Sequence, residues 1–214
     1  MSGNSSGRKA SVHRKTKETE VRVDIDLDHA AEPRVRTGVG FFDHMLDALG
    51  KHGRFALQIE AKGDLHIDQH HLVEDVGIAL GSALRQALGP DLRILRFAHA
   101  YAPLDDALVR VVADISGRAF LHFDFTPSRD RVGEFDTDLV VEFYRAFVTN
   151  AEINLHVTLV HGSNPHHQIE ALFKATALAL RQAVTVDPTL TGIPSTKGTL
   201  AEDAARLGKR SPGS

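Results

Sequence analysis

The sequence contains no cysteine, which excludes a disulfide framework, a thiolate metal site and a cysteine nucleophile. No apolar run approaches the roughly 20 residues that a membrane-spanning helix needs, and residues 1–17 lack the apolar segment of a signal peptide. The charges nearly balance, with 25 basic and 28 acidic residues and a net charge of −3. This balance argues against a broad nucleic-acid-binding surface. We therefore expect a cytoplasmic protein that contacts neither nucleic acids nor membranes.

Histidine, by contrast, is abundant, with 13 of the 214 residues. The apolar pattern predicts strands that alternate with helices, as in an α/β or α+β fold. Strands are expected at 21–27, 55–59, 64–67, 107–115, 120–125 and 153–160, and helices at 41–49, 70–88, 138–149 and 166–184. Residues 1–13 and 201–214 are polar, and we expect them to form disordered tails.

The chain carries an internal repeat. Residues 70–74 read His-His-Leu-Val-Glu and residues 166–170 read His-His-Gln-Ile-Glu, and each motif opens an expected helix. The pentad Ala-Leu-Arg-Gln-Ala follows at Ala83 and at Ala179, 13 residues after the motif starts in both copies (83 − 70 = 13 and 179 − 166 = 13). Upstream, 64–67 resembles 154–157. The repeat predicts two half-domains, 14–90 and 91–200, the second ending in a loop suited to phosphate.

The repeated motif has the residue types of a metal site. Residues four apart share one face of a helix, which pairs His70 with Glu74 and His166 with Glu170. His71 and His167 are turned about 100° away, so adjacent histidines suit two metals better than one. Each metal would take a pair from one repeat and the turned-away histidine of the other. Imidazole and carboxylate without sulfur favour Mn²⁺, Fe²⁺ or Zn²⁺, and carboxylate-rich octahedral sites favour Mn²⁺. The alternative is that these residues cap helices or face solvent.

Cationic and hydroxyl side chains outside the apolar pattern are candidates for binding an anion. They are Arg96, Arg118, Lys174, Ser195 and Lys197. Guanidinium, ammonium and hydroxyl groups together make a phosphate site, although each alone is more often a solvated surface group. The sequence has neither the P-loop pattern nor the dinucleotide-binding glycine pattern, so it does not indicate nucleotide binding.

Six motifs resemble those of the imidazoleglycerol-phosphate dehydratase family, in the same order from about residue 14 to about residue 200. They are 37–45 (Thr-Gly-Val-Gly-Phe-Phe-Asp-His-Met), 68–75 (Asp-Gln-His-His-Leu-Val-Glu-Asp), 103–106 (Pro-Leu-Asp-Asp), 114–118 (Asp-Ile-Ser-Gly-Arg), 164–174 (Asn-Pro-His-His-Gln-Ile-Glu-Ala-Leu-Phe-Lys) and 194–198 (Pro-Ser-Thr-Lys-Gly). The resemblance implies a manganese enzyme of histidine biosynthesis that dehydrates imidazole glycerol phosphate to imidazole acetol phosphate.

The resemblance also implies a fold, an assembly and residue roles. The fold is α+β with duplicated half-domains, each a four-stranded sheet with helices packed on it, of the ribosomal protein S5 domain 2-like type. Trimers would assemble into a 24-mer with active sites between subunits and two Mn²⁺ per site. The implied metal ligands are His44, His70, His71, Glu74, His166, His167 and Glu170, of which His44, His71, Glu74 and Glu170 also count as catalytic. Arg96, Arg118, Lys174, Ser195 and Lys197 match phosphate-binding groups, and Glu18 matches an acid/base residue.

One departure concerns Glu142, where many family members carry a histidine. Glu142 is the second-half counterpart of His44, and a carboxylate can replace imidazole on Mn²⁺. We therefore expect Glu142 to be a ligand, and the alternative is a role beside the ligands.

In the expected mechanism, the substrate's imidazole expels the neighbouring hydroxyl through a diazafulvene-like intermediate. A base then takes the proton from the next carbon, and we assign this to Glu18, with metal-bound hydroxide as the alternative. Two other classes stay open. One is a dinuclear hydrolase of phosphate esters, and the other is a metal-dependent assembly without catalysis.

Overall fold

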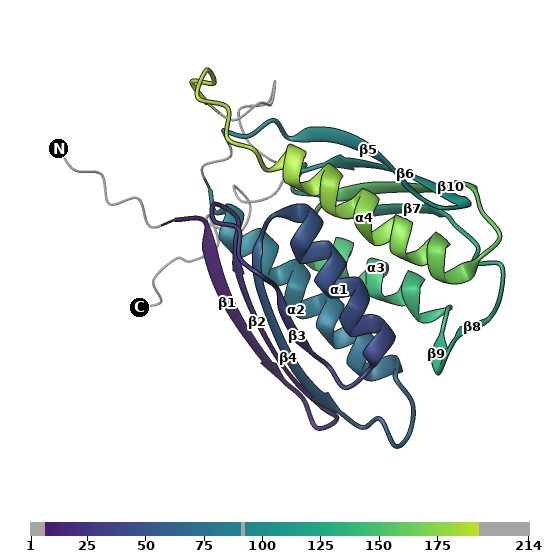
Figure 1. Ribbon diagram of the computed structural model, residues 1–214. Coiled ribbons are helices and arrows are strands. Elements are labelled where there is room, and N and C mark those ends of the chain that lie inside the picture. The colour runs from purple at the N-terminus through teal and green to yellow at the C-terminus, as the bar shows by residue number, and fades with distance from the viewer. Residues whose placement is uncertain (1–6, 91–92, 193–214) are drawn as a thin grey trace.

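The computed structural model describes residues 7–90 and 93–192, which form two four-stranded sheets with helices between them (Figure 1). The first sheet has the order β1-β2-β4-β3, with β1 (Lys9–Lys15), β2 (Thr19–Asp26), β3 (Arg34–Arg36) and β4 (Ala56–Gly63). The second has the order β5-β6-β10-β7, with β5 (Phe97–Leu104), β6 (Ala107–Asp114), β7 (Phe120–Asp124) and β10 (Asn154–His161). The helices are α1 (Gly40–Gly53), α2 (His70–Leu88), α3 (Leu139–Ala151) and α4 (Pro165–Ala183). A small hairpin joins β8 (Arg131–Val132) to β9 (Phe135–Asp136).

The two sheets share one topology, which confirms the α+β fold with duplicated halves. In each sheet three strands are antiparallel neighbours and the edge strand, β3 or β7, runs parallel to its partner. The halves also agree residue by residue. The short helices α1 and α3 end at left-handed caps, Arg54 with φ 56° and Glu152 with φ 55°, and the next strand begins two residues later in both.

The helices pack crosswise between the halves. α1 of the first half lies along α4 of the second, and α2 lies along α3. Glycines allow the close approach of α2 and α3. A Cβ on Gly77 would lie 2.7 Å from the Phe143 carbonyl oxygen, and one on Gly81 would lie 2.9 Å from the Ala151 nitrogen. Because the helices pack against those of the other half, and the long helices α2 and α4 also cover the sheets of their own halves, the two halves share one core.

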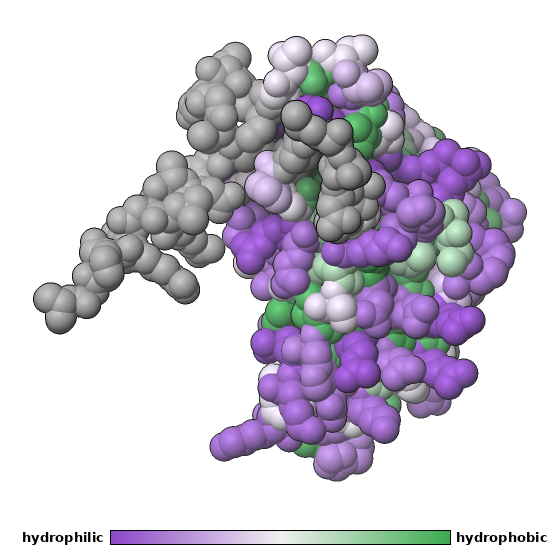
Figure 2. Space-filling model, turned by 90° about the vertical axis from the view of Figure 1, so that its left-hand side faces the viewer, coloured by the Kyte–Doolittle hydropathy of each residue, from purple (hydrophilic) through white to green (hydrophobic). Residues whose placement is uncertain are grey.

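The outer faces of the two sheets differ in character. On the first sheet the exposed residues of β2 and β4 are polar and mostly charged, as at Glu20, Arg22 and Glu60. Figure 2 looks onto this side and shows mostly hydrophilic side chains with hydrophobic ones between them. On the second sheet, Phe97, Tyr101 and Phe120 remain 60%, 52% and 53% exposed.

Most expected elements are present, and the helix expected at 70–88 has the bounds of α2. Two expectations are wrong. Residues 9–13, assigned to the N-terminal tail, form most of β1, whose alternating polar residues mark an exposed edge strand. Residues 64–67, expected as a strand, form a turn after β4 and therefore do not match 154–157, which begin β10. β3, β5, β8 and β9 were not expected. None of the helices in the described ranges is long and apolar enough to cross a membrane.

We expect Gly81→Ala to destabilise the protein by about 1–3 kcal/mol, because the added methyl group pushes α2 away from α3. This cost exceeds the roughly 1 kcal/mol by which alanine is favoured over glycine inside a helix. Urea unfolding followed by circular dichroism measures the difference. Gly40→Ala is the matched control, since a Cβ at Gly40 meets no atom within 4 Å. Equal stability of the two variants would contradict the packing argument.

Candidate metal and substrate site

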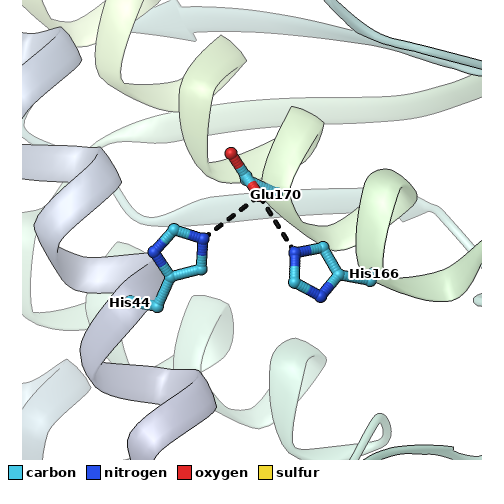
Figure 3. A group of neighbouring side chains, drawn as sticks. All are labelled: His44, His166 and Glu170. Carbon is cyan, nitrogen blue, oxygen red and sulfur yellow. Dashed lines mark hydrogen bonds and ion pairs between the residues drawn. The ribbon is translucent and has the colours of Figure 1, made fainter.

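Crosswise packing brings three potential metal ligands together from distant parts of the chain. Glu170 on α4 accepts from His166 on the same helix, with 3.1 Å between Nε2 and Oε2, and from His44 on α1, with 3.2 Å between the corresponding atoms (Figure 3). Their potential ligand atoms all lie within 4.8 Å of one another. The expected i, i+4 pair of His166 and Glu170 is thus formed, and the third ligand comes from the other half.

The start of α4 fixes the position of its histidine pair. The Asn164 side chain caps the helix and accepts hydrogen bonds from the backbone N–H groups of His166, at 2.9 Å, and His167, at 3.4 Å. Pro165 occupies the first helical turn, where its missing N–H costs nothing. The two imidazole planes are 85° apart, so the neighbouring histidines face different directions.

Glu170 is held as an anion. Burial acts to raise its pKa, but the Lys174 ammonium, 2.6 Å from Oε1, together with the bonds from His44 and His166, lowers the pKa to about 2. The Glu170 side chain is only 13% exposed. The carboxylate therefore stays charged at any pH at which the protein works, and its second oxygen is shared by the two imidazoles.

The second histidine of each motif lies against a carboxylate that the sequence analysis did not single out. His167 Nδ1 is 2.7 Å from Asp106 Oδ1, and His71 Nδ1 is 3.0 Å from Asp64 Oδ2. The hydrogen bond that Asp64 accepts from His71 raises the pKa of His71, and the bonds that Asp106 accepts from His167 and Ser163 hold the pKa of Asp106 far below its usual range. Only Asp106 had a sequence signal, because it ends the Pro103–Asp106 motif.

The first-repeat ligands are not gathered in the same way. In the described ranges, only one group of three histidine or acidic residues has potential ligand atoms that all lie within 4.8 Å of one another, namely His44, His166 and Glu170. Glu142 instead accepts from Arg145 at 2.5 Å, one turn along α3. Its place nevertheless matches that of His44, since each lies ten residues before its helix cap (54 − 44 = 10 and 152 − 142 = 10). His70 packs edge-on to His71, and Glu74 follows one turn along α2.

Glu18 lies in the turn between β1 and β2, close to the first-repeat histidines. Its Oε2 is 3.9 Å from His71 Nδ1, and its side chain is 57% exposed. Its backbone N–H donates to the Thr16 hydroxyl, which fixes the turn. The expected acid/base residue is therefore beside an expected ligand and open to solvent.

The candidate phosphate groups fall in two places. Arg96 is paired with Asp114, at 2.7 Å between Nε and Oδ1, and Arg118 lies in the adjacent loop after β6. Lys174 is instead bound to Glu170. Ser195 and Lys197 lie outside the described residues. β6 separates Asp114 from Asp106 and His167, and its eight residues span roughly 25 Å. One chain thus holds Arg96 and Arg118 far from its own His167.

The comparisons with known proteins agree on one class, a carbon–oxygen lyase that removes water. The family model for imidazoleglycerol-phosphate dehydratase matches residues 37–180. The enzyme of that name from Methylobacillus flagellatus is 56% identical over 194 residues, which cover 90% of this chain and 98% of that protein. The one from Limosilactobacillus fermentum is 49% identical over 193 residues, covering 90% and 100%.

Solved structures give the same result. The Staphylococcus aureus imidazoleglycerol-phosphate dehydratase superposes with a TM-score of 0.76 at 40% identity and covers 84% of this chain and 99% of its own. The Pyrococcus furiosus enzyme gives 0.77 at 35%, covering 88% and 100%. The chain belongs to the imidazoleglycerol-phosphate dehydratase family and is an enzyme of the hydro-lyase class.

We expect Lys174→Met to make the metal-free protein more sensitive to acid. Lys174 holds the Glu170 pKa at about 2, below the ordinary 4.5. A lowered carboxyl pKa contributes stability that is present above pH 4.5 and is lost as the pH falls through the folded-state pKa. Without the ammonium the folded-state pKa lies closer to 4.5, so Glu170 contributes less stability between pH 2 and 4.5 and the midpoint of acid unfolding moves to higher pH. Unfolding followed against pH in chelator measures this shift. Lys51→Met is the control, because Lys51 is exposed and its ion pair with the exposed Glu32 is long, at 3.8 Å. Identical acid curves would refute the assignment.

Proposed function

We propose that the protein eliminates water from imidazole glycerol phosphate to give imidazole acetol phosphate, a step of histidine biosynthesis in the cytoplasm, and that it requires two Mn²⁺ ions per active site. The observation that carries the metal requirement is the convergence of His44, His166 and Glu170 from both halves of the chain. The Glu170 carboxylate, with two imidazoles at 3.1 and 3.2 Å from one of its oxygens, presents the mixed nitrogen and oxygen donors that Mn²⁺ accepts.

The second ion would be held by the first-repeat ligands. His70 and Glu74 share a face of α2, and Glu142 occupies the place on α3 that His44 occupies on α1. His71 and His167 face away from these groups and are available to ions held mainly by neighbouring subunits. When bound at the ring nitrogens of the substrate, the two ions would make the imidazolate form accessible and so favour loss of the neighbouring hydroxyl.

The residues of the chain would then bind the substrate and move its protons. The bond between the ring-linked carbon and its hydroxyl breaks, and that hydroxyl leaves with a proton as water. Glu18 takes the proton from the adjacent carbon, and the electron pair of that bond forms the double bond of an enol. Protonation of the ring-linked carbon and loss of the proton of the enol hydroxyl convert the enol to the ketone. The two protons released, this one and the one taken by Glu18, balance those gained by the departing water and by the ring-linked carbon. Glu18 suits this task because its carboxylate is exposed beside His71.

The separation of the two arginines from His167 supports active sites between subunits. The roughly 25 Å along β6 exceeds the reach of a small phosphate ester, so Arg96 and Arg118 would serve a site on a neighbouring chain. Exposed aromatic side chains on the second sheet, Phe97, Tyr101 and Phe120, favour a covered face in an assembly. We propose a homo-oligomer, a 24-mer built from trimers, with Ser195 and Lys197 completing the phosphate site.

The first test is turnover of imidazole glycerol phosphate by chelator-stripped protein with and without added Mn²⁺. We expect Mn²⁺ to restore formation of the ketone, measured by its absorbance in alkali, without release of inorganic phosphate. Phosphate release would instead indicate a hydrolase of phosphate esters. Bound metal with an intact oligomer and no turnover would indicate a structural metal site and would overturn the proposal.

A second test mixes two inactive variants, Arg118→Ala and His167→Ala. Each variant lacks one part of a site that we place between chains, so each alone is expected to be inactive. If the variants are dissociated and reassembled together, a site formed by two chains regains both parts in about a quarter of random pairings. The recovered rate is compared with that of each variant reassembled alone. No recovery in mixed oligomers of confirmed composition would place both groups in one chain's site.

A further inference from the structure

The two halves place a carboxylate at the same point of the fold. Glu18 directly precedes β2, and Asp106 directly precedes β6 (19 − 18 = 1 and 107 − 106 = 1). These strands match end to end, since the last residue of each, Asp26 or Asp114, pairs with the first residue of β4 or β10. Glu18 and Asp106 are therefore structural counterparts, and each lies near the second histidine of its own half. Their surroundings, however, differ.

Asp106 is fully engaged by its neighbours. Oδ1 lies 2.7 Å from His167 Nδ1. Oδ2 accepts from the Ser163 backbone N–H at 2.7 Å, from the Ser163 hydroxyl at 2.8 Å and from the Asn164 N–H at 3.1 Å. Because both oxygens have partners, this carboxylate is fixed in place and holds the imidazole of His167 in one orientation. With Nδ1 as the donor, Nε2 keeps the lone pair that binds a metal.

In the first half, Asp64 lies where Asp106 lies in the second. Asp64 Oδ2 is 3.0 Å from His71 Nδ1, whereas Glu18 Oε2 is 3.9 Å away, beyond hydrogen-bonding distance. Asp64 follows Gly63, which pairs with the first residue of β2. In the second half a register shift in β10 places Gly162 against Ala107, the first residue of β6, with 2.9 Å between a Cβ on Gly162 and that of Ala107. Gly162 thus corresponds to Gly63 and Ser163 to Asp64, so the second half has no carboxylate at that place.

We propose that Asp106 positions His167 for metal binding, and that Asp64 performs this task for His71 and thereby leaves Glu18 free to transfer protons. The inference rests on the proposed function, because it assigns His71 and His167 as ligands. Asp64 and Asp106 are positioning residues that act through their histidines. The two corresponding carboxylates thus have different roles: Asp106 positions a histidine in the second half, and Glu18 transfers protons in the first.

The first experiment counts the Mn²⁺ ions that metal-free protein binds, from the electron paramagnetic resonance signal of free Mn²⁺. Asp106→Ala and the isosteric Asp106→Asn are expected to weaken binding of one ion about 10- to 100-fold. Ser163→Ala removes one bond to Asp106 but leaves His167 in place, and it should bind Mn²⁺ as the wild type does. Wild-type binding by both Asp106 variants would overturn the role of Asp106.

The second experiment is a double-mutant cycle on the first half. Asp64→Ala opens the place beside His71, and Glu18 moves into it, so we expect Mn²⁺ affinity to change less than about threefold while kcat falls at least tenfold. Glu18→Gln should lower kcat with Mn²⁺ affinity unchanged, and Glu20→Gln, which alters the exposed glutamate two residues away on β2, should leave both unchanged. The double variant Asp64→Ala/Glu18→Gln should bind one ion about 10- to 100-fold more weakly. If the effects of the two single substitutions on Mn²⁺ affinity simply add in the double variant, Glu18 does not take over the contact with His71 when Asp64 is removed. That result would overturn this part of the inference.

A third measurement depends on neither metal nor turnover. In a crystal structure of metal-free Asp64→Ala protein, we expect a Glu18 oxygen within hydrogen-bonding distance of His71 Nδ1. A Glu18 side chain that stays away, with His71 in a new rotamer, would overturn the inference even in an active enzyme. The two proposals can also fail separately. If the wild type neither binds Mn²⁺ nor dehydrates the substrate, the proposed function is rejected. A shift of Glu18 toward His71 in the Asp64→Ala variant would still support the exchange of positions between Asp64 and Glu18.

Discussion

The crosswise packing of the helices is the constraint on which the site depends. Each short helix lies along the long helix of the other half, α1 on α4 and α3 on α2. His44 therefore meets Glu170, 126 residues away in sequence, and no arrangement of one half alone could bring them together. Glycines on α2 make the approach possible. Stability and the arrangement of the potential metal ligands are consequently coupled, because any change that separates α1 from α4 also separates His44 from Glu170.

The sequence predicted the periodic features well and the irregular ones poorly. The repeated motif defined both long helices, the i, i+4 pair of His166 and Glu170, and the equivalence of His44 with Glu142. It did not predict β1, whose exposed edge position gives it a polar composition. It also assigned 64–67 to a strand, because these residues resemble 154–157 in sequence. The backbone there forms a turn, whereas 154–157 begin β10.

The sequence also did not predict that Asp64 and Asp106 contact the second histidine of each motif. Asp64 and Asp106 come from different elements, one following β4 and the other preceding β6, yet they contact corresponding histidines. A repeat comparison aligns Asp64 with Ser163 and Asp106 with Glu18, so neither aligned residue makes the same contact with a histidine. Only three-dimensional placement reveals that the same contact has been made twice. The matching of sites between duplicated halves therefore has to be judged by contacts and not by aligned letters.

The halves have also diverged in charge, and this gives the two ligand sets unequal properties. The set of His44, His166 and Glu170 contains one carboxylate, and Lys174 neutralises it. The matching set of His70, Glu74 and Glu142 contains two, and the residue on α2 that corresponds to Lys174 is Ile78 (174 − 96 = 78, as 170 − 96 = 74). More carboxylate and no ammonium strengthen the attraction for a divalent cation. Arg145 offsets part of this charge by binding Glu142. A cation that binds Glu142 would displace Arg145 from this carboxylate. Glu170, by contrast, binds Lys174 through Oε1 and keeps Oε2 for the two imidazoles. The duplication has thus produced two sets of potential ligands that differ in charge, and under the proposed function this difference would suit a substrate whose two ring nitrogens are themselves inequivalent.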